Sequence, residues 1–555
     1  MILRQIIFLI LILCYGTAHS QLSQTWLRTH NGSANGTDEA LFHATDNAGN
    51  VYAAGKIFST GSGFDIFVSK YDANGSTIWE RTFDGTGNAK DIAYAVKVDN
   101  SGNVFLAGES TGDSTGADFI TIKYSSDGSE QWINRYDGNS NSMDFIEKLL
   151  IDDLGNVIVL GTSYEIGNLF DLVLIKYSNA GIMQWTKTYN GQASGNDIAD
   201  DLALDAAGNI FVAANSFGSG TLSDFLILKY NSNGDTLWSR KYNGPVNGHD
   251  NFTSMTIDNN GNIAIAGSSV GSGTSLDFAV LKYSSMGELL WLRRYTGPAT
   301  SSPDEPKAIA HDSAGNIYVT GTSVGQSTSY DYLTVKYSPS GDMIWDRRYT
   351  GQFNNSFDEP TGVCTDASGN VFVAGMSDGA GALSDMVILK YDSVGSLIWN
   401  TRYNSASNGF DKPNKISIDN YESVLISGSV TGVGTGMDFA VLKYSQLTAV
   451  GSTTELSPSG FSLSQNYPNP FNPSTTIGFT LPFDGSVSLN IFDVEGKKVA
   501  QLINKIMPAG SHSLTFNVSE SKPQLPTGTY FYRLNYVALN SGMQFSNVKK
   551  MLLIK

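Results

Sequence analysis

Residues 91–136 read DIAYAVKVDNSGNVFLAGESTGDSTGADFITIKYSSDGSEQWINRY and contain four short segments with the pattern of β-strands. We expect these strands at residues 92–98, 104–107, 118–124 and 131–136. The run from Asp99 to Asn103 suits a hairpin turn, because Asp, Asn and Gly tolerate the φ angles that such turns require. The second and third segments are apolar almost throughout, as in strands covered on both faces. The stretch therefore predicts four-stranded sheets that cover each other's faces.

The same unit recurs along the chain. All eight tryptophans lie on one series with a step of 53 or 54 residues, namely Trp26, Trp79, Trp132, Trp185, Trp238, Trp291, Trp345 and Trp399. A Lys-Tyr pair and three aspartates recur with the same step. The first aspartate series is Asp38, Asp91, Asp144, Asp197, Asp250, Asp304, Asp358 and Asp411, the second begins at Asp46, and the third begins at Asp65. Repeated four-stranded units of this kind are typical of propeller blades.

The two ends of the repeat region predict how the ring closes. The region begins with a lone tryptophan strand near Trp26 and ends with a Lys-Tyr strand at Asp438–Tyr444. If these two segments pair, they complete an eighth sheet and leave no free edge strand. We therefore expect an all-β, eight-bladed β-propeller. A linear solenoid is the alternative, but it would need capping repeats, and neither end resembles a cap.

Charge and composition exclude several classes of function. The chain has 555 residues, a net charge of −17, two cysteines and 58 glycines. Between Gln21 and Thr454 there are 26 basic and 47 acidic residues, so the acidity belongs to the repeat region. Such a surface argues against binding to nucleic acid, which requires a basic face. Two cysteines cannot support a disulfide framework or a Cys-based zinc site.

Both ends of the chain differ from the repeats. Residues 1–20 have the pattern of a secretory signal peptide, with Arg4, an apolar run at Ile6–Leu13 and a small-x-small site at Ala18–Ser20. This run is too short for a membrane-spanning helix, and we do not expect an integral membrane protein. An uncleaved anchor and a lipid-modified Cys14 are weaker alternatives. The mature chain would keep only Cys364, expected to be a buried thiol.

The organisation that we predict is a signal peptide at 1–20, a propeller at 21–445, a small and polar linker at 446–460 and a separate domain at 461–555. The last segment alternates like short strands with Gly and Pro turns. This composition predicts a small Ig-like β-sandwich.

The repeat pattern resembles the bacterial SBBP or beta-propeller repeat proteins. The matching residues are Asp-x-x-Gly-Asn followed by alternating apolar residues, Asp-Phe-x-x-x-Lys-Tyr, and Gly-x-x-x-Trp. The resemblance implies a secreted or envelope protein and no defined chemistry. The tryptophan step also looks like the tryptophan-docking repeat of quinoprotein dehydrogenases, which implies that the Trp packs between neighbouring blades. The adjacent cysteine pair of those enzymes is missing, so we expect no quinone cofactor.

The last hundred residues resemble a type IX secretion sorting domain. Five blocks carry the resemblance, at residues 466–477, 491–499, 508–512, 525–534 and 549–555. The motif residues are Asn469, Pro470, Phe471, Asn472, Pro473, Gly510, Gly528, Tyr530, Lys549 and Lys550. The resemblance implies export through the outer membrane of a Bacteroidota-type bacterium, to the medium or the cell surface, with the type IX machinery as partner. It also implies removal of the domain.

The first aspartate series offers a candidate cation site, because closing the ring would place eight carboxylates in a circle and hard oxygen ligands suit Ca²⁺. The favoured interpretation is that each Asp accepts hydrogen bonds from turn amides in its own blade. Runs such as Asp46–Asn50 lack the spacing and terminal Glu of an EF-hand. We predict no other cofactor.

No catalytic residues emerge from the sequence. The few histidines are not at metal-binding spacing, and no nucleophile elbow is present. The units differ most in the loops 245–249, 298–303 and 352–357, on the face where we would expect a ligand. The favoured function is a binding or interaction module for a polysaccharide or an envelope or surface protein. The alternatives are a polysaccharide hydrolase or lyase, which paired carboxylates outside the three series would favour, and a structural surface-layer component.

Overall fold

The computed structural model describes residues 21–447 and 462–554, except 114–115, 139–141, 166–168, 192–194, 300, 353–355, 380–382, 482, 495–496, 521–524 and 539–543. The predicted signal peptide at 1–20 and nearly all of the predicted linker at 446–460 lie outside the described residues. The chain divides into two compact units, of which one ends at Leu447 and the other continues from Thr448. Each unit is described by itself.

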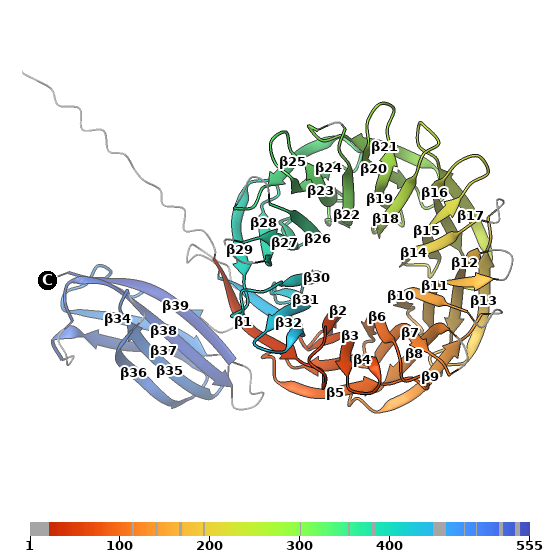
Figure 1. Ribbon diagram of the computed structural model, residues 1–555. Coiled ribbons are helices and arrows are strands. Elements are labelled where there is room, and N and C mark those ends of the chain that lie inside the picture. Colours follow the sequence, from red (N-terminus) through yellow and green to blue (C-terminus); the bar gives the residue numbers. More distant parts are fainter. Residues whose placement is uncertain are drawn as a thin grey trace, which may run out of the picture. The chain divides into compact units, whose positions relative to one another are not determined.

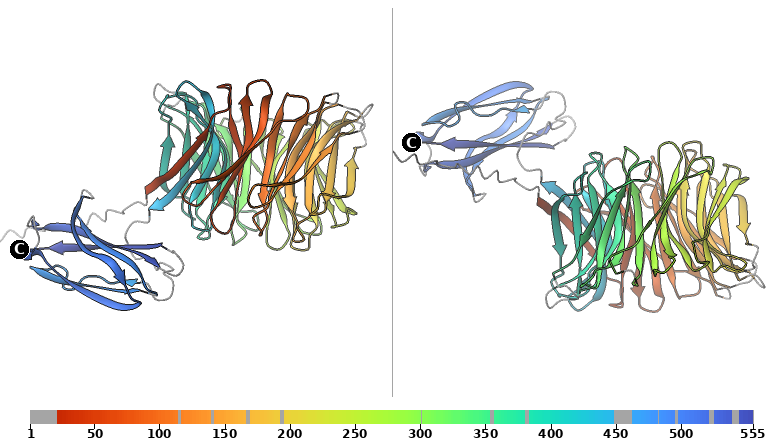
Figure 2. Two further views of the ribbon diagram at one scale, coloured as in Figure 1. Left: turned by 90° about the horizontal axis from the view of Figure 1, so that it is seen from below. Right: turned by 90° about the horizontal axis from the view of Figure 1, so that it is seen from above.

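The first unit is an eight-bladed β-propeller, as predicted (Figure 1). In the second blade the strands are β6 (Asp91–Val98), β7 (Val104–Thr111), β8 (Ala117–Tyr124) and β9 (Glu130–Tyr136), paired antiparallel in this order from the axis outward. These bounds agree with the predicted segments to within a few residues. Figure 2 shows the strands running between the two faces of the ring.

All eight blades have the same four positions. The innermost strands are β2 (Glu39–Thr45), β6, β10 (Asp144–Ile151), β14 (Asp197–Leu204), β18 (Asp250–Ile257), β22 (Asp304–His311), β26 (Asp358–Thr365) and β30 (Lys412–Ile418). The second strands are β3 (Val51–Ser59), β7, β11 (Val157–Glu165), β15 (Ile210–Phe217), β19 (Ile263–Val270), β23 (Ile317–Val324), β27 (Val371–Asp378) and β31 (Val424–Gly432). The third strands are β4 (Gly63–Tyr71), β8, β12 (Leu169–Tyr177), β16 (Ser223–Tyr230), β20 (Leu276–Tyr283), β24 (Tyr330–Tyr337), β28 (Ser384–Tyr391) and β32 (Gly436–Leu447). The outermost strands are β1 (Gln21–His30), β5 (Thr77–Phe83), β9, β13 (Met183–Tyr189), β17 (Thr236–Tyr242), β21 (Leu289–Tyr295), β25 (Met343–Tyr349) and β29 (Leu397–Tyr403).

The closing blade combines the two ends of the repeat region, as predicted. Its strand order is β1-β32-β31-β30, and Trp26 lies opposite Lys443 in the ladder between β1 and β32. Figure 1 shows β1 beside β32 at this junction. Because the first strand completes the last sheet, the ring has no open blade-to-blade edge.

Neighbouring blades are locked by the tryptophans, in the packing role that the resemblance implied. The Trp79 ring packs on Gly128 in the turn of the next blade, and its Nε1 donates a hydrogen bond to Ser126 O at 3.1 Å. Gly128 has a φ of +82°, and a Cβ there would lie 2.8 Å from the Trp79 ring. The position is therefore suited to glycine alone. Arg81 Nε donates to Gly128 O at 2.7 Å and covers the same turn.

The hairpin turn after each innermost strand uses the second aspartate series. Asp99 O accepts from Gly102 N at 2.9 Å, and the Asp99 carboxylate accepts from the backbone and side chain of Asn103. The lysine of the Lys-Tyr pair extends this contact to the next blade. Lys229 Nζ lies 3.1 Å from Asp205 Oδ2 and donates to Ser285 O at 3.0 Å. The polar groups of the repeat thus stabilise turns and junctions.

The core lies between the faces of adjacent blades. Side chains of the second and third strands are almost all buried on both faces, in agreement with their continuous apolar pattern. One such layer joins Tyr52 and Val68 of the first blade to Leu106 and Ile122 of the second. Burying these side chains drives the stacking of the blades.

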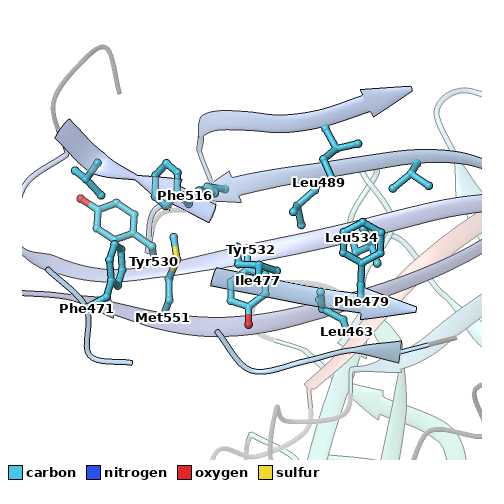
Figure 3. Packing of buried hydrophobic residues seen from close by; sticks show 14 of the residues in the cluster. Leu463, Phe471, Ile477, Phe479, Leu489, Phe516, Tyr530, Tyr532, Leu534 and Met551 are labelled. Atoms are coloured by element: carbon cyan, nitrogen blue, oxygen red, sulfur yellow. The ribbon is translucent and has the colours of Figure 1, made fainter. Parts of the chain in front are cut away.

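The second unit is a small Ig-like β-sandwich. One sheet contains β33 (Ser462–Leu463), β34 (Ser474–Leu481) and β37 (Gly510–Asn517). The other contains β36 (Lys498–Met507), β35 (Gly485–Phe492), β38 (Gly528–Ala538) and β39 (Gln544–Leu553), and a 3-10 turn covers Val518–Glu520. Phe471, Ile477, Tyr532, Leu534 and Met551 are among the side chains that fill the core (Figure 3). No helix in the described part of the chain has the length and apolarity needed to cross a membrane.

The tryptophan lock predicts a difference between two equivalent substitutions. Trp399 lies in the blade that faces the closing sheet, and its buried Nε1 has no acceptor among the described residues. We therefore expect Trp79→Phe to reduce the free energy of unfolding by about 1 kcal/mol more than Trp399→Phe, since only Trp79 loses an indole hydrogen bond. Calorimetric unfolding of the two variants measures this difference. Equal reductions in the free energy of unfolding would show that the indole hydrogen bond does not contribute to the stability of the contact between blades.

Candidate functional site

The first aspartate series lies where each innermost strand begins. All eight carboxylates are almost fully buried, and each accepts a hydrogen bond from a loop amide of its own blade junction. Examples are Gly85 N to Asp91 Oδ2 and Gly138 N to Asp144 Oδ2, both at 2.8 Å, and Ser405 N to Asp411 Oδ2 at 2.6 Å. The same contact is made by the remaining five, Asp38, Asp197, Asp250, Asp304 and Asp358. These aspartates therefore hold the loops at one face of the ring.

Two groups of three carboxylates could hold a cation. In each of the groups Asp65, Asp84, Asp91 and Asp118, Asp137, Asp144, one ligand atom per residue lies within 4.8 Å of the others. The groups differ in their neighbours, because Arg135 Nη1 lies 2.5 Å from Asp118 Oδ2. Arginines at the equivalent position pair with Asp277, Asp331 and Asp385 in other blades. The first blade has Thr82 there, so its three carboxylates are the better ligand set for Ca²⁺.

The axial channel is the place where the repeat loses its symmetry. A cavity of about 380 Å³ is lined by residues from all eight innermost strands, which surround the centre of the ring in Figure 1. Each of these strands has a β-bulge at the same point, for example between Ile146 and Lys148, and a bulge re-aims side chains. The residues three places after the first aspartate are Leu41, Tyr94, Glu147, Asp200, Thr253, Lys307, Thr361 and Asn414. The same position of the repeat thus carries apolar, aromatic, acidic, basic and neutral polar side chains in different blades.

The wall of this cavity is rich in lysine. Lys97, Lys148, Lys307 and Lys415 line it, together with one acidic residue, Asp201. Lys148 Nζ lies 3.6 Å from Asp201 Oδ1, whereas Lys415 Nζ donates to the backbone carbonyl of His43 at 2.9 Å. Burial, together with repulsion by Lys97 and Lys148, lowers the pKa of Lys415 to about 7.

Two further carboxyls lie on the innermost strands, outside the three aspartate series. Burial, with a smaller repulsion from Glu109 and Asp201, raises the pKa of Glu147 to about 7. Burial, followed by repulsion from Glu147, raises the pKa of Asp200 to about 8, although Asn215 Nδ2 donates to its Oδ2 at 2.8 Å. Shifted carboxyls of this kind are suited to general acid catalysis. The sequence analysis named neither residue.

The loops that the sequence favoured for binding lie at the face where the innermost strands begin. In this region the rings of Phe357 and Tyr330 are 5.7 Å apart, and His249 Nδ1 lies 3.0 Å from Ser223 Oγ. Two further pockets lie at the opposite face of the ring. They are formed between the turns that contain Asp46, Asp99 and Asp152. The channel residues were missed because they look like ordinary strand positions until the eight units are superimposed.

The sorting motif forms a structural unit within the second domain. Phe471 is buried, and its backbone pairs with the last strand through Phe471 N to Leu552 O at 2.9 Å and Ile554 N to Phe471 O at 3.0 Å. Asn469 Oδ1 also accepts from Leu552 N at 2.8 Å. The first and last blocks of the motif therefore meet. Gly510 and Gly528 begin strands β37 and β38, Tyr530 is buried, and Lys549 and Lys550 lie on β39 opposite Tyr532 and Phe531.

His43 is a buried group at the closing junction that the sequence analysis did not single out. Its Nδ1 lies 2.9 Å from Ser427 Oγ and its Nε2 lies 2.6 Å from Ser417 Oγ, both in the closing blade. Burial, with a smaller effect from Lys415, lowers the pKa of His43 well below 6.5. The imidazole is thus held neutral between the first and last blades.

The neutral state of His43 predicts a pH dependence of stability. Below about pH 6.5 the unfolded state binds a proton that the folded state excludes, so acidification favours unfolding by up to about 1.4 kcal/mol per pH unit. We expect the stability advantage of the wild type over His43→Gln to shrink from pH 7 to pH 5 in denaturant titrations. Ser427→Ala is the control, because it removes a partner but keeps the titrating ring. A constant difference between wild type and His43→Gln would contradict the prediction.

The carboxylate group of the first blade predicts a stabilising substitution. We expect Thr82→Arg to place a guanidinium beside Asp65, as Arg135 does beside Asp118, and to raise the free energy of unfolding by about 1 kcal/mol in the presence of chelator. Millimolar Ca²⁺ should raise the melting temperature of the wild type and have a smaller effect on the variant, which competes with the ion. Thr82→Gln is the neutral control. If Ca²⁺ and chelator leave the wild-type melting temperature unchanged, the cation site is refuted.

Comparisons with known proteins agree with both domains. Residues 465–550 match the secretion system C-terminal sorting domain family, and residues 291–326 match the beta-propeller repeat family. An uncharacterized WD repeat-containing protein of Acanthamoeba polyphaga mimivirus is 24% identical over 478 residues, covering 67% of this chain and 32% of that protein. The chain therefore spans about a third of the length of this curated relative.

Two of the solved structures to which the chain is similar are PorZ and a WD40 domain. PorZ, a surface component of the type-IX secretion system of Porphyromonas gingivalis, is 12% identical with a TM-score of 0.38, and the match covers 94% of this chain and 75% of PorZ. The WD40 domain of SCAP from fission yeast is 10% identical with a TM-score of 0.44, covering 77% of this chain and 98% of that domain. The chain therefore contains a match to the beta-propeller repeat family within its eight-bladed ring and a C-terminal sorting domain, which supports export by the type IX secretion system to the cell surface or beyond.

Proposed function

We propose that this exported propeller is a binding module whose ligand enters the axial channel. The observation that supports the proposal is the loss of eightfold symmetry in the channel, where the innermost strands carry Tyr94, Glu147, Asp200, Thr253 and Lys307 at equivalent positions. The tryptophans, turn aspartates and Lys-Tyr pairs repeat because every blade needs them for packing. Side chains that depart from the repeat are not required by the packing of the ring, so they are available to bind a ligand.

The charges in the channel favour function over stability. Lys415 in the cavity wall has a pKa of about 7, and Asp200, next to the wall residue Asp201, has a pKa of about 8; both shifts arise mainly from burial. Burying groups in this way destabilises a fold, so shifted groups in a cavity are candidates for a functional site. The cavity of about 380 Å³ has the size of small-ligand sites. A polysaccharide end or a protruding loop of a surface protein fits this space better than a flat protein surface.

A second candidate function is hydrolysis or elimination on an extracellular polysaccharide. The carboxyls Glu147 and Asp200, on the contacting strands β10 and β14, favour it, because Glu147 raises the pKa of Asp200 and the two pKa values lie near neutral, at about 7 and 8. Such a pair can supply an acid and a base for cleavage of a glycosidic bond. In this interpretation the channel would bind the chain and the two carboxyls would act on it.

One experiment separates binding from catalysis. We expect the mature full chain to gain several degrees in melting temperature with at least one saccharide from a panel of surface polysaccharide fragments, because a ligand at about 100 times its Kd adds about 2.7 kcal/mol. Ser254→Trp, which narrows the channel, should abolish this gain, whereas Ile78→Trp on the exposed outer rim should not.

The same saccharide is then assayed for release of reducing ends or unsaturated products. Turnover that is lost in Glu147→Gln and Asp200→Asn, with binding retained, would establish the enzyme. Binding without turnover would establish the module. A panel that gives no shift, or a shift that Ser254→Trp does not change, would refute the channel as the binding site.

A further inference from the structure

We propose that Lys97, Lys148 and Lys415 form an anion-binding site in the axial channel, which takes a ligand bearing a carboxylate, sulfate or phosphate group. The inference rests on the proposed function and specifies the chemistry of its ligand. It also explains why one cavity of an acidic protein has a basic wall.

The sign of the charge in the cavity is opposite to that of the rest of the ring. Four lysines and one aspartate line it, whereas the repeat region as a whole has 26 basic and 47 acidic residues. A low-dielectric cleft lined by one sign of charge concentrates ligands of the opposite sign. The channel is therefore suited to an anion.

The lysines of the wall differ in how far the protein neutralises them. Lys307 Nζ has two carboxylate neighbours, Glu359 Oε1 at 2.8 Å and Glu305 Oε2 at 3.7 Å. Lys148 has one carboxylate neighbour, because its Nζ lies 3.6 Å from Asp201 Oδ1. Lys97 and Lys415 form no ion pair with any residue that the structure describes. Two ammonium groups in the wall thus have no ion-pair partner among the described residues, although Asp201 acts on Lys97 from a greater distance.

Asp201, with one negative charge, cannot neutralise the three lysines Lys97, Lys148 and Lys415. Its Oδ1 accepts from Leu202 N and its Oδ2 from Met255 N, both at 2.9 Å. Strands β6, β10 and β30 bring Lys97, Lys148 and Lys415 together. Burial and Lys148 lower the pKa of Lys97, against a smaller opposing effect of Asp201, and burial, Lys97 and Lys148 lower the pKa of Lys415. A bound anion would offset this repulsion with charge-assisted hydrogen bonds.

The other carboxyls near the channel do not supply the missing charge. Glu147 and Asp200 have raised pKa values of about 7 and 8, so near neutral pH Asp200 is mostly protonated and Glu147 is only partly ionised. Glu109 is paired with Lys90, and Glu39 lies 3.7 Å from Lys56. The belt of Lys97, Lys148 and Lys415 therefore keeps a net positive charge.

The rest of the wall indicates that the anionic group is part of a larger polar molecule. Thr253 and Ser254 place hydroxyl groups in the wall of the same cavity, and Tyr94 contributes an aromatic ring to it. Thr361 and Asn414 keep acceptor oxygens there, because their donors bind backbone carbonyls of Ala374 and Ala40. This combination suits an acidic saccharide, whose hydroxyls and ring faces need such partners. A uronate, a sulfate ester and a phosphate ester share the required charge, and only measurement distinguishes them.

The test uses the mature full chain and defined probes at constant ionic strength. Trigalacturonate, a sulfated disaccharide, inorganic phosphate and a neutral cello-oligosaccharide are titrated by calorimetry and by melting temperature. We expect at least one anionic probe to bind, and Lys97→Met, Lys148→Met and Lys415→Met each to weaken its affinity by about tenfold or more. Lys187→Met, on the outermost strand β13, is the control and should bind like the wild type.

Two readouts separate binding from a folding defect. Without ligand, Lys415→Met should melt at a higher temperature than the wild type, because it removes an uncompensated charge from the channel. In the wild type, the affinity for the anionic probe should fall from pH 6 to pH 8. Lys415 loses its proton as the pH passes its pKa of about 7, and Glu147 and Asp200 become negatively charged over the same range.

The possible failures are distinct. If the neutral oligosaccharide binds as well as the anionic probes, and Ser254→Trp abolishes both, the anion site is overturned while the channel remains the binding site. If anionic probes bind equally to all three lysine variants, the site lies elsewhere and the inference fails. If no probe binds, both the inference and the proposed function lose their support.

Discussion

The packing of seven of the eight tryptophans on a glycine of the next blade is the contact on which the ring depends. Seven glycines that follow this pattern, from Gly75 to Gly395, have positive φ angles, and a Cβ at any of them would lie about 3 Å or less from the facing indole ring. The turn and the tryptophan therefore specify each other. Each of these seven contacts fixes the next blade at one distance and one angle, and the circle closes because β1 returns to complete the last sheet.

Strict repetition of the scaffold leaves the innermost strands free to vary. Their outward-facing residues, such as Val96 and Leu149, pack in the blade-to-blade core, while the bulged positions meet around the axis. Glu147 and Asp200 occupy such bulged positions and Lys97 lines the cavity three residues after one, and all three groups are costly to remove from water. The ring can tolerate this cost because its stability is distributed over eight junctions. A rigid and repetitive shell around a variable channel is a sound basis for recognising a ligand.

The repeat and the sorting domain were predictable because their signals are local. The tryptophan series gave the number of blades, and Asp99 to Asn103 gave a turn whose hydrogen bonds lie within five residues. The channel was not predictable in the same way. Glu147 and Lys148 look like two residues of an amphipathic strand, and only the bulge between Ile146 and Lys148 brings this segment to the axis with both of them. Variation between the units is most visible in the loops, whereas a single departure inside a repeated strand pattern gives a weaker signal.

The sequence by itself determined the eight-bladed ring, its closure by the first strand and the sorting domain that indicates export. Each of these follows from a short motif and its spacing. Only the tertiary structure determined which charged and polar side chains of different blades lie close together. Lys97, Lys148 and Lys415 come from the second, third and eighth blades, and His43 of the first blade meets Ser417 and Ser427 of the last. Electrostatic interaction depends on distance in space, and closing a ring brings together residues that the chain keeps far apart.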